Sequence, residues 1–545
     1  MALLGATTLT FTPTYMQNDD VVMAMIASGR GVALQPDAHL VYVNLALGEL
    51  LRRAYVAAPA LPWYGLLLLA VLAAAQVALL AGRLARERWQ DRDAAVGLWL
   101  PYVAYFVAVV SVFVVHLHFT AVGSLAAGVG LALWIARLAP RSSGPANGSR
   151  RPSAGGWLLI ALLLLLGGLL RFDALLLALV VALPLAIERL IRSDRRMALR
   201  AVGGLAAVLS LPFALQLWDR AAYDRDPGWR EFRELNAWRA RIVDYGAGGD
   251  GPEGRALEQG VGWSANDAVM LRRWFYADRR VFPIEAMRRL VGAAPLAKPD
   301  AAETWSRIRE AFHHPSFVPF LLSLPLLVAR GRGRERLRIL GLTLVPALAV
   351  VVGLAVLLRA PEHVSLPALA FPATALLVVG SGDDVPPRRG RLWGSALVLA
   401  FLAVTVAVRL DRQDAQSAVE ENRDLRASVA LLQSGTRQLY VDWAGTFRYE
   451  AILPLEDASY LSGLRLYSLG WPQRSPVADR MLQAAGIDDL FRSFFERPDV
   501  GLLMVPSWRD SLETYAREHY GVDVRVRESA RTPAFSVFRV ERSKS

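Results

Sequence analysis

Residues 18–29 read Asn-Asp-Asp-Val-Val-Met-Ala-Met-Ile-Ala-Ser-Gly and come before the first long apolar stretch of the chain. Asn18 is a typical helix N-cap, and Asp19 and Asp20 then fall in the first turn, where the positive end of the helix dipole favours carboxylates. Gly29 suits the end of this helix, because glycine adopts the left-handed conformation without strain. The stretch therefore predicts a short helix that fixes two acidic side chains at its mouth.

A second short helix is expected directly afterwards. Pro36 and Asp37 form a helix start signal, and residues 38–55 place apolar side chains on one flank and arginines on the other. We expect this amphipathic helix to lie along a membrane surface. Residues 62–64 (Pro-Trp-Tyr) then bring aromatic rings to the water–lipid boundary, so the acidic pair should stand just outside a bilayer.

Composition places the chain among membrane proteins. Its 545 residues are 54% hydrophobic, with a mean hydropathy of +0.31, which is too apolar for an ordinary soluble enzyme. The net charge of +12 could indicate a nucleic-acid partner, but the basic residues are mostly arginines in short runs between apolar stretches, so we expect none. The absence of cysteine excludes disulfides and thiolate metal sites.

Apolar stretches predict ten membrane spans. They lie near residues 62–83, 94–115, 119–138, 157–170, 173–191, 199–218, 315–329, 338–358, 364–380 and 392–409. Residues 1–13 have no basic signal-peptide region and are too short to span. We expect them to be the tail of a partial span whose beginning is absent from this chain.

Arginine runs predict the orientation. They occupy five connections, at 83–93, 137–156, 189–200, 330–338 and 388–391, which alternate strictly with the others. The positive-inside rule places all five in the cytoplasm. The outer loops 14–61 and 219–314, and everything after Arg409, should then face the outside.

The predicted fold is mainly α, a polytopic helical bundle in residues 1–410 followed by a small extracytoplasmic α/β domain in residues 411–545. The C-terminal domain is expected because candidate strands alternate with candidate helices there. The strands are expected at 438–442, 500–506, 522–527 and 534–540, and the helices at 477–496 and 508–519.

Arg171, Phe172 and Asp173 interrupt the apolar run of residues 157–191. At about 1.5 Å per residue this run is too long for one ordinary span and short for two. Two short helices would bury their turn below the outer surface, where a charge must face a cavity or a partner. Arg171 and Asp173 should line a recess open to the outside, or else pair or snorkel at a shallow turn.

The outer loop 219–314 repeats the acidic pattern. Ser264 should cap a helix over 263–287 that carries Asn266 and Asp267 in its first turn. The many aromatic rings of this loop suit stacking on sugars or anchoring at the interface equally.

All seven histidines are expected outside the membrane or at its outer edge. His39 and His363 are candidates for substrate binding, although interfacial histidine is usually structural. One histidine could bind a divalent metal ion together with the acids, but no spacing indicates a dedicated metal site.

The motif of Asn18, Asp19 and Asp20 in the first outer loop resembles the Asp-Glu or Asp-Asp motif of the GT-C superfamily, the polytopic glycosyltransferases that use lipid-linked sugars. Residues 170–177 (Leu-Arg-Phe-Asp-Ala-Leu-Leu-Leu) are similar to the arginine-containing helix start of the same superfamily. The order of loops, spans and C-terminal outer domain also matches. The chain departs from the pattern by lacking a complete first span and by carrying Asp20 where Glu is commoner.

The resemblance implies that Asp19, with Asp20 beside it, deprotonates an acceptor hydroxyl that attacks the anomeric carbon of a polyprenyl-phosphate sugar. Arg171 would stabilise the departing phosphate. The remaining polar candidates would bind substrate: Asn18, His39, Asp173, Asn266, Asp267 and His363. The partners would be a lipid-linked donor and a glycan, lipid or protein acceptor, at the outer face of a bacterial inner membrane.

Two alternatives remain open at this point. One is a transporter or flippase of a lipid-linked or small polar substrate. Such a protein would place essential charges near the midplane of the membrane and would often carry a pair of broken helices, one in each half. The sequence shows one interrupted apolar segment and no second copy. A non-catalytic component of envelope assembly would use the outer loops as a partner surface.

Overall fold

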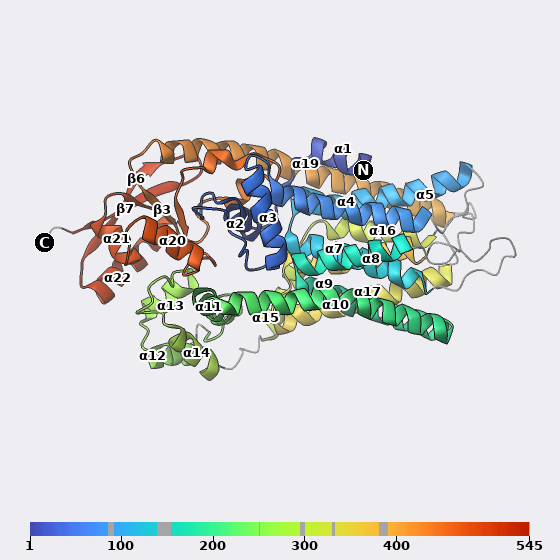
Figure 1. Cartoon of the computed structure of the whole chain (residues 1–545), viewed down its shortest axis with the longest axis horizontal. Coiled ribbons are helices and arrows are strands. Elements are labelled where there is room, and N and C mark those ends of the chain that lie inside the picture. The colour runs from blue at the N-terminus through green and yellow to red at the C-terminus, as the bar shows by residue number, and fades with distance from the viewer. Residues whose placement is uncertain are drawn as a thin grey trace.

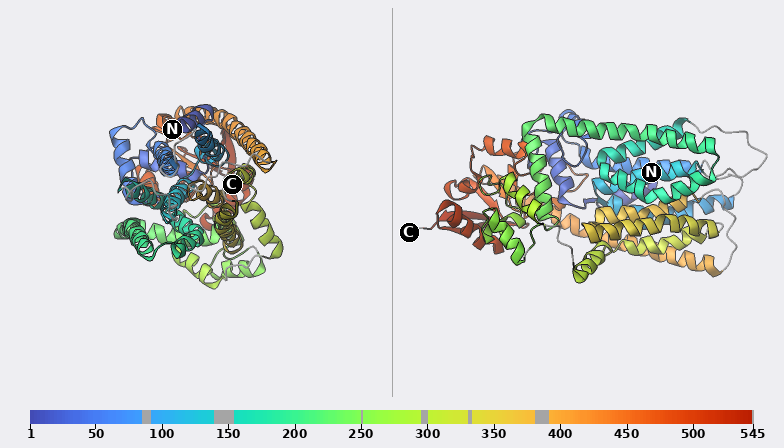
Figure 2. Two further views of the ribbon diagram at one scale, coloured as in Figure 1. Left: turned by 90° about the vertical axis from the view of Figure 1, so that its right-hand side faces the viewer. Right: turned by 90° about the horizontal axis from the view of Figure 1, so that it is seen from below.

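The structure is a computed structural model that describes residues 1–84, 92–138, 154–249, 251–294, 300–329, 333–380 and 391–543. A helical bundle forms one end of the long axis, and a C-terminal α/β unit with several outer-loop helices forms the other (Figure 1). Figure 2 shows the same division from below.

Among the described residues, six helices are long and apolar enough to cross a membrane. They are α4 (Trp63–Leu84), α7 (Phe119–Ala136), α9 (Phe172–Arg192), α10 (Arg195–Arg225), α17 (Gly333–Leu357) and α19 (Arg391–Gln433). Shorter apolar helices complete the bundle: α5 and α6 (Arg92–Tyr105 and Ser111–Val115, joined by the π-helical η1, Phe106–Val110), α8 (Ala154–Leu170), α16 (Phe317–Ala329) and α18 (Glu362–Val378). These helices coincide with the ten predicted stretches. The mainly α, polytopic class with a small C-terminal sheet is confirmed.

Helix α7 is the centre of the bundle, and all of its residues are buried. It packs against α4, α8, α9 and α18. Small residues permit this close approach: a Cβ at Gly167 of α8 would lie 2.8 Å from the carbonyl oxygen of Gly123 in α7. The first residues of α7 are therefore held rigidly where the acidic motif meets them.

The short α1 (Ala2–Thr10) lies against α6. At the same end of the bundle, the two-residue strands β1 (Thr14–Tyr15) and β2 (His116–Leu117) pair in parallel. This pair ties the segment before the acidic motif to the segment before α7.

The acidic motif and the arginine-bearing helix ends lie at opposite ends of the bundle. Figure 1 shows α2 (Asn18–Ser28) and α3 (Leu45–Ala57) beside the C-terminal unit, whereas the end of α4 and the start of α10 lie at the far end. Most of the predicted cytoplasmic connections 83–93, 137–156 and 388–391, and the first three residues of 330–338, lie outside the described residues, whereas 189–200 is described in full. The positive-inside interpretation requires this separation. Which side of the membrane each end of the bundle faces stays a prediction.

The C-terminal sheet has the order β4-β3-β5-β7-β6. Strands β3 (Leu439–Asp442), β4 (Leu466–Ser468) and β5 (Val500–Leu503) are parallel, and β6 (Val524–Arg531) and β7 (Ser536–Arg542) are antiparallel. Four of the strands were predicted, and the three-residue β4 is too short for a sequence pattern. The predicted helix over 477–496 is two helices, α20 (Pro476–Ala484) and α21 (Leu490–Glu496), because Gly486 between them is left-handed with φ 62°.

Helices of the outer loop share one hydrophobic core with this sheet. They are α11 (Pro227–Val243), α13 (Ala265–Arg272) and α14 (Ile284–Ala293), with α12 (Pro252–Gly260) beside them and α22 (Arg509–Tyr520) opposite α13. Leu235, Met270 and Trp443 belong to this core. The part of the loop from α11 to α14 therefore packs with the C-terminal unit. The last helix of the loop, α15 (Ala301–Ala311), packs against α17 of the bundle instead.

Three further local predictions were wrong. Gln17, not Asn18, is the N-cap of α2, and Asn18 is its first helical residue. Residues 38–44 are not helical, because Val41 has φ 69° and the side chain of Asn44 caps α3 by accepting from the amide of Ala46. The helix predicted over 263–287 ends at Arg272, two residues before the left-handed Trp274.

Candidate active site

Helix α2 is a buried helix with one polar end. Val21, Val22, Met23, Met25 and Ile26 are buried within the bundle, so the helix is apolar on all sides. Gly29 closes it in the left-handed conformation, with φ 70°. The sequence thus drives the body of α2 into the core and leaves its acidic N-terminus at the boundary with the outer unit.

Asp20 joins three helices. Its carboxylate is fully buried, and Oδ1 accepts a hydrogen bond from the Tyr64 hydroxyl at 2.9 Å and from the amide of Phe119 at 3.0 Å. Burial raises the pKa of Asp20 well above its usual value, against these two hydrogen bonds. Its Oδ2 lies 3.8 Å from Nε2 of His118 and has no hydrogen-bond partner among the described residues.

Asp19 is the partly exposed member of the pair. Burial raises its pKa to about 6, whereas the positive charges of Arg239 and Arg171 act in the opposite direction. The first-turn position of Asp19 led us to expect an ionised carboxylate. A carboxylate with this pKa is still mostly ionised at neutral pH and is a stronger base than a solvated aspartate.

Arg171 lies at the break between α8 and α9, where it is the N-cap of α9 with extended backbone. Its guanidinium stands 5.4 Å from the centre of the Tyr42 ring and 5.9 Å from that of Phe119, and it pairs with Asp173 at 3.2 Å. The Arg171 side chain is 30% exposed and that of Asp173 is 76% exposed. Both alternatives from the sequence occur together, since the two residues pair and also line a recess.

That recess is a cavity of about 210 Å³. Its lining is dominated by polar and charged side chains from the segment before α3, the α8–α9 break, the end of α10 and α11: Tyr42, Asn44, Arg171, Asp173, Asp219, Arg220, Tyr223 and Arg233. The Asp219 carboxylate accepts from the amide of Leu45 at 2.7 Å, which holds the start of α3 at the wall. Three arginines around one cavity suit an anionic group such as a phosphate.

Two histidine rings stack beside the acidic pair. The centres of His118 and His363 are 4.1 Å apart, with 8° between the rings. His118 is 1% exposed, and burial lowers its pKa, helped by His363 and Arg171, so its imidazole is neutral. Nε2 of His118 and Nδ1 of His363 make no hydrogen bond to any described residue. The sequence indicated His363, but it did not select His118.

Arg239 and Tyr42 are site residues that the sequence did not reveal. Arg239 is 2% exposed, donates to Asp244 at 2.8 Å, and stands 4.5 Å from the centre of the Trp274 ring. Its effect on the pKa of Asp19 is the larger of the two arginine effects. No local pattern marks Arg239, because only the tertiary fold brings α11 near enough to Asp19 for its charge to act there.

The C-terminal unit closes the site from the other side. The amide of Leu466 donates to the carbonyl of Gly31 at 3.0 Å, and Trp471, just after β4, makes an edge contact with Tyr42 at 5.1 Å. Asn18 donates its backbone amide to Glu450, which follows β3. Trp471 comes from the loop after the carboxyl end of the parallel strand β4, the edge at which open α/β sheets bind ligands.

The other predicted substrate-binding residues lie in structural contacts. His39 bonds to Asp37 at 2.7 Å and stacks on Trp229 at 4.6 Å. Asn266 donates to the carbonyl of Ser511 at 3.0 Å, and Asp267 is buried in the cap of α13. None of His39, Asn266 and Asp267 lines the cavity of Arg171. Of the other predicted site residues, Arg171 and Asp173 line the cavity. Asn18, Asp19 and Asp20 open α2, and His363 stacks on His118 beside Asp20, but none of these four lines the cavity.

Comparisons with known proteins give little. No protein-family model matches the chain, and no curated protein matches it. Among solved structures, the chain is similar to the crystal structure of ArnT from Cupriavidus metallidurans in the apo state, with a TM-score of 0.41, 14% identity, and coverage of 98% of this chain and 97% of that one.

Proposed function

We propose that this protein is a membrane glycosyltransferase of the GT-C type, which moves a sugar from a polyprenyl-phosphate donor to an acceptor hydroxyl on the outer side of the membrane. The observation that carries the proposal is Asp19, a partly buried carboxylate with a pKa of about 6 that feels the charges of Arg171 and Arg239 at the mouth of a helical bundle. A carboxylate with a raised pKa can accept the proton of a hydroxyl group, and cations beside it can stabilise a phosphate leaving group.

Asp19 acts as the general base. It takes the proton of the acceptor hydroxyl as the oxygen forms a bond to the anomeric carbon and the bond from that carbon to the phosphate oxygen breaks. General-base catalysis of this kind contributes roughly 10²–10⁴ in rate. Asp20 has no exposed surface, so it acts as a positioning residue that fixes α2 against α4 and α7.

Arg171 receives the negative charge that develops on the departing polyprenyl phosphate. It lines the cavity together with Arg220 and Arg233, and the cavity adjoins the membrane-spanning α8, α9 and α10. A lipid-linked donor can then keep its tail among the helices while its phosphate meets the arginines. Arg239 lies on the opposite, outer side in α11, where its charge opposes the protonation of Asp19.

The sugar and the acceptor would bind between Asp19 and the outer unit. Tyr42 offers an aromatic face close to Phe119 and Trp471, and aromatic faces stack well on sugar rings. The half-buried His363 adds a ring nitrogen that can hydrogen-bond sugar hydroxyls or phosphate oxygens.

The test is a transfer assay on the purified full chain in lipid nanodiscs. The donors are synthetic polyprenyl-phosphate-linked hexoses and pentoses with a radiolabelled sugar, and the acceptors are extracted from the membranes of the source cells. We expect Asp19→Asn to lose transfer while its chromatographic and thermal behaviour stays that of the unchanged protein. Glu234→Gln, an exposed acid on the outer-loop helix α11, is the matched control and should transfer normally.

Two results would overturn the proposal. Full transfer by Asp19→Asn would exclude Asp19 as the general base. Movement of intact labelled donor across sealed vesicles by the unchanged protein, with no sugar released or transferred, would show a flippase instead.

A further inference from the structure

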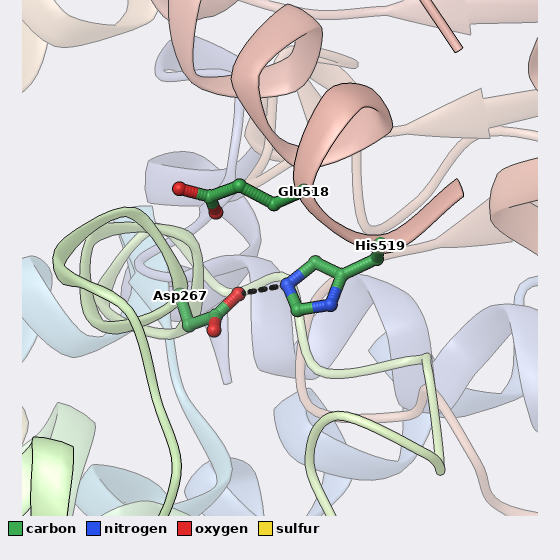
Figure 3. Close-up of side chains that lie close together, drawn as sticks. All are labelled: Asp267, Glu518 and His519. Carbon is green, nitrogen blue, oxygen red and sulfur yellow. Dashed lines mark hydrogen bonds and ion pairs between the residues drawn. The ribbon is translucent and has the colours of Figure 1, made fainter. Parts of the chain in front are cut away.

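A second cluster of ligand-type side chains lies away from Asp19, where the outer loop meets the C-terminal unit. Asp267 of α13 stands opposite Glu518 and His519 at the end of α22 (Figure 3). One ligand atom from each of the three side chains lies within 4.8 Å of the others. The proposed glycosyl transfer makes no use of this cluster.

The cluster is held by the cap of α13. Asp267 is 1% exposed, and its Oδ2 accepts the amide of Ser264 at 2.9 Å while its Oδ1 faces Nε2 of His519 at 2.6 Å. The Ser264 hydroxyl donates to Glu518 at 2.9 Å. Two carboxylates and one imidazole are thus fixed in one place, and each carboxylate oxygen keeps a further lone pair for a ligand.

We propose that Asp267, Glu518 and His519 form a divalent transition-metal site, suited to Zn²⁺, that joins α13 to α22. An imidazole nitrogen with carboxylate oxygens is a donor set that Zn²⁺ accepts, with bonds of about 2.0–2.2 Å. The imidazole disfavours Ca²⁺ and Mg²⁺, which take oxygen ligands. Glu518 is exposed, so water completes the coordination from the solvent side.

Metal binding replaces the hydrogen bond between His519 and Asp267. Nε2 of a neutral His519 must give up its hydrogen to bind a metal ion, so the proton moves to Nδ1 through solvent and Asp267 Oδ1 binds the ion directly. If His519 is protonated beforehand, one proton leaves to solvent. The metal then links the outer loop to the C-terminal unit, and it stabilises the folded chain as any ligand of the native state does.

The experiment uses the full chain in detergent micelles, with its affinity tag removed and its metals stripped by a chelator. Co²⁺ is titrated in and followed by its visible absorption, and Zn²⁺ is then added as competitor. We expect one Co²⁺ per chain, displaced by Zn²⁺. His519→Gln and Glu518→Gln should weaken Co²⁺ binding about tenfold or more, since even the loss of an outer-shell partner costs about that much.

His313→Gln and Asp510→Asn are the matched controls, because each removes an exposed side chain of the same type outside the cluster. Both should bind Co²⁺ like the unchanged protein. Zn²⁺ should also raise the thermal unfolding temperature of the unchanged protein but not that of His519→Gln. Co²⁺ binding that is equal in His519→Gln and the unchanged protein, or absent from both, would overturn the metal site. The cluster would then be only a hydrogen bond between His519 and Asp267.

Discussion

Helices α2 and α13 begin with similar sequences and use them differently. Asn18-Asp19-Asp20 opens α2, and Asn266-Asp267 falls in the first turn of α13. In α13 the cap is complete, because Ser264 and Asp267 bond to each other's amides and Asp267 also bonds to His519. In α2 the side chain of the N-cap Gln17 makes no capping hydrogen bond, and the charges of Arg171 and Arg239 act on Asp19.

The difference teaches what separates a capping acid from a candidate catalytic one. Asp267 accepts the amide of Ser264 and bonds to His519, so it holds α13 in place, and the metal ion proposed above would keep that structural role. Asp19 is desolvated instead, and this burial raises its pKa although Arg239 and Arg171 act in the opposite direction. The surroundings of the helix, and not its first turn, decide the role.

The largest expected effect is a loss of transfer rate, and one substitution in each helix tests whether α2 and α13 differ in role. Asp19→Asn should lower transfer by roughly 10²–10⁴ with little change in stability, since the proton acceptor is lost. Asp267→Asn should leave transfer within about twofold but cost about 1–2 kcal/mol of unfolding free energy, since a cap and a buried hydrogen bond weaken. Rates in nanodiscs and unfolding in metal-free detergent would measure both, and a reversed pattern would contradict the two roles.

Arg171 gives the next largest effect. Arg171→Ala should lower kcat/KM for the lipid-linked donor by about 10–100-fold, because a charge-assisted contact to phosphate is worth about 1.5–3 kcal/mol. Arg171→Lys should recover part of this loss, since the lysine keeps the charge but not the bidentate geometry. Arg192→Ala, which removes an exposed arginine from the other end of α9, is the control. Equal rates in Arg171→Ala and this control would exclude Arg171 from donor binding.

Arg239 gives the smallest and most specific effect. Its charge lowers the pKa of Asp19, so Arg239→Gln should move the acid side of the pH–rate profile to higher pH. Arg239→Lys keeps the charge and should restore the original position. A variant that loses rate equally at every pH would show that Arg239 only supports the packing around Asp244 and Trp274.

The sequence predicted much of the fold and part of the site. Apolar periodicity located the helices of the bundle, and the interruption at Arg171 and Asp173 located a recess, because burying charge in a membrane needs such a feature. The first-turn position of Asp19 and Asp20 was also correct.

The remainder depends on tertiary contacts. Arg239, Tyr42 and the stacked His118 reach the site only through the tertiary fold, which brings α11 and the N-terminus of α7 near the start of α2. No local sequence pattern encodes that arrangement. The helix expected over 38–55 starts late for the same reason, since the hydroxyl of Tyr223 bonds to the amide of Val41 and holds that segment non-helical.

The pH dependence of kcat/KM for transfer by the unchanged protein tests the central claim most directly. Asp19 must be ionised to accept a proton, and burial raises its pKa to about 6, so the rate should be level at neutral pH and should fall as the pH drops through about 6. The residual rate of Asp19→Asn should show no such fall. An acid limb near the pKa of a solvated aspartate, about 3.9, or one that persists in Asp19→Asn, would contradict the assignment of Asp19 as the base.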